Sequence, residues 1–257
     1  GRSYRRKETE ETMSETDVMV ETTLRIPGTW HDAHELMARL PEGYRIIPQA
    51  LALPDGTEIE FTPLPPDDQF AKIFQSACRK SPTAEEMRRV NGYTVNLGLI
   101  GPGGSMAAAL TTMQAGAAIV RAGGAGVFID NSGLAHGGED WIKMAEDGSS
   151  DAVSFAFVNI VKGKEDVRTV GMRAMGLPDI VMQLTDTDTD GEVIIDAVRS
   201  MCRSEKPMGD GHLLVVQAGP HRLVQATNRD LSESTISMRN PFGRLQLLRS
   251  SDGAKLN

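Results

Sequence analysis

Apolar and polar residues alternate along several short segments of the chain, and elsewhere apolar residues recur every three or four positions. Alternation with a period of two is typical of half-buried strands, whereas three-to-four spacing is typical of amphipathic helices. On this basis the first third of the chain is predicted as strand, helix, two strands and helix. These segments are 17–26, 30–40, 44–53, 57–62 and 67–78.

A second and longer series of such segments begins near residue 93. The segment 152–161 is predicted as its strongest strand, since apolar residues fill both faces, as in a strand at the centre of a sheet. Glycine and proline residues predict turns between the other segments of the series. The remaining predicted strands are 93–99, 123–130, 167–175, 180–184, 213–217, 223–226, 235–238 and 244–248, and the predicted helices are 106–120, 139–146 and one starting at 190.

Both series contain the order β-α-β-β-α. We therefore predict an α+β fold of two ferredoxin-like (split β-α-β) units with mostly antiparallel sheets. The N-terminal unit is expected to span 17–80 and the C-terminal unit, with its terminal hairpins, 92–257. Residues 1–16 are expected to form a disordered tail, and the polar segment 80–91 to link the two units.

Composition narrows the class of protein. The chain has 257 residues, of which 40% are hydrophobic and 24% charged, as in ordinary globular proteins. Its net charge of −8 argues against duplex nucleic acid and against anionic membrane surfaces as partners. No run approaches the roughly 18 apolar residues that span a bilayer. We expect a cytoplasmic protein in which Cys78 and Cys202 are buried thiols on helix stripes.

A glycine-rich loop separates the predicted strand 93–99 from the helix that follows. Free backbone N–H groups and the helix dipole can hold an anion there. Asp130 lies at the end of the next predicted strand, the position at which dinucleotide-binding folds carry the acid that binds the nucleotide ribose. However, Met106 occupies the third glycine position of the dinucleotide fingerprint. The alternative is a tight turn that lets a small-faced helix approach the sheet. The candidate ligand residues of the loop are Gly101, Gly103, Gly104 and Ser105.

An acidic segment before the last predicted helix matches the first six positions of an EF-hand calcium loop. Its candidate metal ligands are Asp186, Asp188 and Asp190. The twelfth position, where the loop needs a bidentate glutamate, is Ala197. The alternative is a solvated acidic turn in which Asp190 caps the helix.

Histidines offer two weaker metal candidates. His31 and His34 stand three residues apart on the first predicted helix, and His136 lies with Glu139 in a glycine-rich loop downstream of Asp130. The alternative for each is an imidazole that caps a helix or lies on the surface. Nucleophile motifs such as G-x-S-x-G and H-E-x-x-H do not occur, so the sequence assigns no catalytic residue and no cofactor.

Short motifs between 131 and 211 resemble a bacterial family of uncharacterised proteins, Domain of Unknown Function 4261. The matching residues are Ser132-Gly133-Leu134, His136, Trp141, Arg168-Thr169-Val170-Gly171-Met172, Gly176-Leu177-Pro178-Asp179-Ile180, the helix from Glu192, and Gly209-Asp210-Gly211. Met172 and Asp179 depart from the leucine and glutamate expected at those positions. The resemblance implies a bacterial protein and brings no activity, cofactor or catalytic residue.

These observations predict a non-catalytic binding or interaction protein whose partner is another protein or a small anionic ligand. Its ligand surface is expected where the loops 101–105 and 130–141, including His136 and Trp141, leave the carboxyl ends of adjacent strands. One alternative is a nucleotide- or anion-binding protein, or an enzyme, that uses the Gly101–Ser105 loop. Another is a structural homo-oligomer built by pairing exposed sheet edges.

Overall fold

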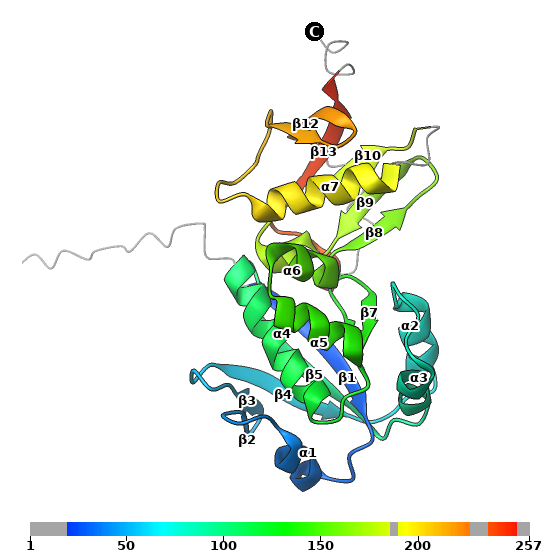
Figure 1. Ribbon diagram of the computed structural model, residues 1–257, viewed down its shortest axis with the longest axis vertical. Helices are drawn as coiled ribbons and strands as arrows, with labels where there is room; N and C mark the ends of the chain where they lie inside the picture. The colour runs from blue at the N-terminus through cyan, green and yellow to red at the C-terminus, as the bar shows by residue number, and fades with distance from the viewer. Residues whose placement is uncertain (1–19, 186–189, 227–235, 251–257) are drawn as a thin grey trace, which may run out of the picture.

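The computed structural model describes residues 20–185, 190–226 and 236–250. Within them the chain forms seven α-helices and two mostly antiparallel sheets (Figure 1). The predicted α+β class is therefore confirmed, whereas its finer description as two ferredoxin-like units stays a prediction. The predicted tail at 1–16 lies outside the described residues.

The first sheet has seven strands in the order β2-β3-β4-β5-β1-β6-β7, and all its pairings are antiparallel. Strand β5 pairs with β1 on one side and with β4 on the other. This sheet consequently extends across the boundary that we predicted at 80–91, because β5, β6 and β7 all follow that segment. The strands are β1 (Glu21–Gly28), β2 (Arg45–Ile47), β3 (Ala50–Ala52), β4 (Glu58–Leu64), β5 (Val95–Pro102), β6 (Gly126–Ile129) and β7 (Leu134–Gly137).

The second sheet has six strands in the order β11-β12-β13-β10-β9-β8. Its pairings are antiparallel except that of β10 with β13, which is parallel. The edge strands of this sheet are β11 and β8. The strands are β8 (Asn159–Lys162), β9 (Asp166–Val170), β10 (Asp179–Gln183), β11 (Leu213–Val216), β12 (Gly219–Gln225) and β13 (Arg244–Arg249).

The predicted strand 152–161 is wrong over most of its length, because Ser150–Phe157 forms helix α6. The Ser149 side chain caps this helix by accepting a hydrogen bond from the Ala152 amide at 3.2 Å. Val153, Ala156 and Phe157 are buried at helical spacing, while Phe155 is exposed. A run apolar on both faces fits a buried helix as well as a central strand, and the serine cap favours the helix.

Helices pack on both faces of the first sheet and against the second sheet. Helix α4 (Met106–Arg121) packs on β1, β5 and β6 and is flanked by α5 (Gly138–Asp147), while α7 (Asp190–Arg203) lies on the second sheet (Figure 1). Helix α2 (Phe70–Ala77) lies beside β7, with α3 (Ala84–Asn91) next to it. The small helix α1 (Ala33–Arg39) follows β1. One large apolar cluster includes buried residues of both sheets.

The two sheets meet at a short 3-10 helix, η1 (Met172–Met175). The Arg173 guanidinium donates hydrogen bonds to the backbone carbonyls of Ser237 at 2.8 Å, Arg239 at 2.9 Å and Glu21 at 3.2 Å. The buried Asp179 carboxylate accepts hydrogen bonds from the Met172 amide at 3.2 Å, from the Thr169 hydroxyl of β9 at 2.8 Å and from the Asn240 side chain, before β13, at 3.0 Å. These bonds tie η1 to the start of β1 and fix the sheets against each other.

Close packing of α4 depends on Gly116 in the middle of the helix. A Cβ atom at Gly116 would lie 2.9 Å from Leu24 Cδ1 and 3.1 Å from Trp141 Nε1. Both neighbours are fully buried, so neither can move aside into solvent. At Gly116 the helix approaches the sheet closely, as we predicted for a helix with a small face.

We expect Gly116→Ala to lower the free energy of unfolding by up to about 2 kcal/mol. Overpacking costs about 1–3 kcal/mol, and the gain of about 1 kcal/mol in helix propensity offsets part of that cost. Gly191→Ala in α7 is the control, because no residue that the structure describes lies within 4 Å of its Cβ position, and there the propensity gain should remain. Urea denaturation of both variants checks this, and equal changes would contradict the packing argument.

Candidate functional site

In the glycine loop that we predicted as an anion site, backbone groups form hydrogen bonds within the protein. The Gly103 amide donates to the Val20 carbonyl at 2.8 Å, and the Gly104 amide donates to the Ala174 carbonyl at 2.9 Å. Ser105 is the N-cap of α4, and its Oγ accepts a hydrogen bond from the Ala108 amide at 3.0 Å. Gly101 is the last but one residue of β5, and a Cβ there would lie 2.4 Å from Thr112 Oγ1. The loop therefore matches the alternative that we stated, a turn that permits close packing.

The two predicted ligand loops do not leave adjacent strands. Strand β1 lies between β5 and β6, so that the starting end of β1 separates the two loops. Asp130 faces Arg25 and accepts two hydrogen bonds from its guanidinium, at 2.8 and 3.0 Å. The second sheet covers this end of the first through Arg173, and Asn131 donates to the Ser237 carbonyl at 2.8 Å. The expected ligand face is thus the junction between the sheets.

His136 and Trp141, which we predicted on that face, have buried side chains. Trp141 is fully buried and donates from Nε1 to the Met113 carbonyl at 3.1 Å. His136 Nε2 lies 2.8 Å from the Ala156 carbonyl, which can only accept, so Nε2 carries the proton. Burial lowers the pKa of His136 to about 4. A neutral, enclosed imidazole holds β7 to α6 and is not available to a ligand.

The metal candidates that the structure describes are not brought together. Asp190 starts α7, and its carboxylate accepts hydrogen bonds from the Thr185 amide at 2.7 Å and the Thr185 hydroxyl at 2.6 Å. Asp186 and Asp188 lie outside the described residues. His31 precedes α1 and is exposed, as is His34, so the two do not share a helix face as predicted. Within 20–185, 190–226 and 236–250, no cluster of three or more His, Cys, Asp or Glu could hold a metal ion.

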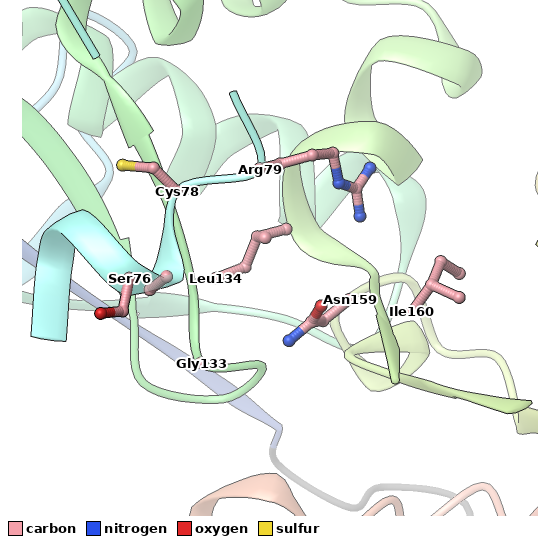
Figure 2. A pocket seen from close by; sticks show the side chains of 8 residues that line it. Ser76, Cys78, Arg79, Gly133, Leu134, Asn159 and Ile160 are labelled. Carbon is pink, nitrogen blue, oxygen red and sulfur yellow. The ribbon is translucent and has the colours of Figure 1, made fainter. Parts of the chain in front are cut away.

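The surface is hollowed where α2, the β6–β7 turn and β8 meet (Figure 2). A central hollow of about 310 Å³ is bounded by residues 76–79, 133–134 and 159–160. A second hollow of about 400 Å³ adjoins it along α2, and a third of about 240 Å³ adjoins it toward α7. We call the three together the Arg79 groove. Its lining residues are Lys72, Ile73, Ser76, Ala77, Cys78, Arg79, Gly133, Leu134, Asp151, Ser154, Phe155, Val158, Asn159, Ile160, Ile195, Val198 and Arg199.

Arg79 joins the central hollow to the third one. Its guanidinium donates to the carbonyls of Phe155, at 3.2 Å, and of Val158, at the C-terminal end of α6. It also lies over the Phe155 ring, 4.5 Å from the ring centroid. A cation at a helix C-terminus satisfies carbonyls that have no partner within the helix. Arg79 is consequently held in place as a wall of the groove.

The polar side chains of the central hollow include those of Asn159 and Cys78. Asn159 donates from Nδ2 to the Ser132 carbonyl at 2.9 Å, which leaves its Oδ1 facing the hollow without a partner among the described residues. Burial raises the pKa of the Cys78 thiol to about 12, with Glu86 and Asp140 adding to the shift. A protonated thiol is a poor nucleophile. In Figure 2 the Cys78 sulfur also points away from Arg79 and Asn159.

Exposed apolar side chains follow the length of the groove. Ile73 of α2, Phe155 of α6 and Ile195 of α7 are 50%, 43% and 38% exposed. They come from three separate helices and line two of the three hollows. Apolar side chains that gather beside hollows on a protein surface are typical of interaction sites.

Comparison with protein-family models, with curated proteins and with solved structures yields no match for this chain. The resemblance to Domain of Unknown Function 4261 therefore stays a prediction. Among the residues that the structure describes, none of the helices has both the length and the apolar character needed to cross a membrane.

Sequence reasoning missed the Arg79 groove because its walls are far apart in the chain and carry no motif. Residues 76–79 and 159–160 are separated by about eighty positions, and tertiary packing, including that of α2 beside β7 and the bonds of Arg79 to α6, brings them together. One usable signal is that the predicted helix 67–78 carries more large apolar residues than its buried face takes up. Phe74 is fully buried, whereas the adjacent Ile73 is half exposed.

Protonation of His136 should make the protein acid-sensitive. The unfolded chain takes up a proton near pH 6.5 and the folded chain near pH 4, so stability present above pH 6.5 is lost as the pH falls toward 4. The loss reaches roughly 3 kcal/mol for this shift. His136→Gln removes the titration and should unfold with a shallower pH dependence in urea denaturation between about pH 7 and pH 4.5. His34→Gln is the exposed control and should behave like the unaltered chain.

Proposed function

We propose that this protein is a non-catalytic binding protein that holds an extended segment of a partner polypeptide in the Arg79 groove. The observation that carries this proposal is the position of β8. It is the end strand of the second sheet, and Ile160 on it lines both the central and the third hollow. An edge strand presents backbone N–H and C=O groups that can pair with an added strand.

The rest of the groove suits a chain of residues better than a compact small molecule. The three hollows adjoin one another in a row from α2 to α7, each sharing lining residues with the next. Separate hollows beside an edge strand accept alternate side chains of an extended peptide, while the backbone pairs with the edge. Exposed Ile73 and Ile195 supply apolar contacts at the two ends.

The chemistry of the lining supports binding rather than catalysis. Nucleophilic catalysis needs a nucleophile within hydrogen-bond reach of a base. The Cys78 thiol is protonated, and the Asp151 carboxylate is taken by the Arg203 guanidinium, at 2.9 Å from its Nε. Arg79 is committed to the carbonyls of α6.

We expect a displayed random peptide library to yield sequences that bind the full chain and compete with one another for one site. The double variant Ile73→Gln/Ile195→Gln should weaken binding of the selected peptides at least tenfold, because both apolar ends of the groove become polar. Isothermal titration of a synthetic selected peptide measures this change.

The matched control is Leu213→Gln/Val215→Gln on β11, whose side chains are 50% and 75% exposed and lie outside the groove. This variant should bind the same peptides as the unaltered chain. If both double variants bind equally well, or the library yields no binder, the proposed function is wrong. Thermal melts confirm that the four substitutions at exposed positions leave the fold intact.

A further inference from the structure

The Arg79 groove carries an excess of positive charge. Its lining includes three cations, Lys72, Arg79 and Arg199, and one carboxylate, Asp151. The Asp151 carboxylate is paired with the Arg203 guanidinium just outside the lining. The chain as a whole has a net charge of −8. A cationic strip on an acidic protein is a local feature that composition does not explain.

These three cations have no acidic partner within the described part of the chain. Six ion pairs occur there, and none of them includes Lys72, Arg79 or Arg199. Arg79 is held by carbonyl groups, which leave its full positive charge in place. Lys72 lies at the α2 end of the groove and Arg199 at the α7 end. Unpaired charge therefore stands at both ends and in the middle.

We propose, on the basis of the proposed function, that the segment bound in the groove is acidic, with carboxylates on both sides of apolar side chains. The apolar side chains enter the hollows beside Ile73 and Ile160. The carboxylates approach Lys72 at one end and Arg199 at the other. Complementary charge of this kind mainly sets which partner is chosen and how fast it associates, while apolar burial supplies most of the affinity.

The observations favour an acidic peptide over a single-stranded nucleic acid. Binding of single strands relies on open aromatic faces on which bases stack. The aromatic side chain of the lining is Phe155, and the Arg79 guanidinium already lies over its ring. The other apolar lining residues are aliphatic, and the acidic chain repels a phosphate backbone at long range.

The test selects peptides from one random library against the full chain and against Lys72→Glu/Arg199→Glu. Asp and Glu should outnumber Lys and Arg in peptides that bind the unaltered chain, and this bias should disappear or reverse for the variant. A selected acidic peptide should bind the variant at least tenfold more weakly, and the difference should shrink in about 0.5 M salt because exposed charges are screened.

The control Arg45→Glu/Lys143→Glu changes the net charge equally at exposed residues outside the groove. It should select the same acidic peptides as the unaltered chain. If the selected peptides show no acidic bias but still lose binding to Ile73→Gln/Ile195→Gln, the acidic partner is wrong and the proposed function stands. If no peptide depends on those two isoleucines, the proposed function itself fails. An oligothymidine whose binding is lost in Lys72→Glu/Arg199→Glu would overturn the proposal in favour of nucleic acid.

Discussion

The contact between η1 and the starting end of β1 is the constraint on which the rest of the structure depends. A single guanidinium, that of Arg173, satisfies three backbone carbonyls drawn from β1 and from the segment before β13. The three carbonyls belong to exposed residues, and behind these bonds one buried apolar cluster joins residues of both sheets. Because this contact fixes the second sheet on the first, it also fixes how far β8 lies from α2. The Arg79 groove is the space that remains between them.

Buried polar groups on the second-sheet side hold η1 in its place. Burial raises the pKa of the Asp179 carboxyl, while hydrogen bonds from Asn240, Thr169 and the Met172 amide oppose that rise. Every one of these partners donates, so the geometry suits the ionised carboxylate. Gly171 and Gly176 flank η1 at φ values of 111° and 75°, which side chains rarely adopt. The sequence motif around Gly171 and Gly176 thus has a structural explanation that requires no ligand.

Much of the fold could be predicted from local patterns, and the failures have physical causes. The helix 106–120 was predicted nearly as it occurs, because its periodic stripe is long, and the predicted strand 93–99 overlaps β5, which continues to Pro102. The segment 152–161 failed because apolar residues on both faces do not distinguish a helix from a strand. The glycine loop is ambiguous in sequence for another reason: glycine loops at strand ends suit both an anion and a neighbouring backbone. In the folded protein the Gly103 and Gly104 amides donate hydrogen bonds to the carbonyls of Val20 and Ala174, and no local pattern in the sequence indicates this.

Arg79 connects the stability of the fold with the proposed binding surface. By satisfying the last carbonyls of α6 and covering the Phe155 ring, it performs the work of a helix cap from a distant part of the chain. A side chain used in this way is ordered before any partner arrives, so a partner bears little of the entropic cost of positioning it. The Arg79 guanidinium forms no ion pair with a carboxylate of the described residues, so it keeps its positive charge. One residue therefore satisfies the end of a helix, gives the groove a rigid wall and supplies a positive potential to the groove.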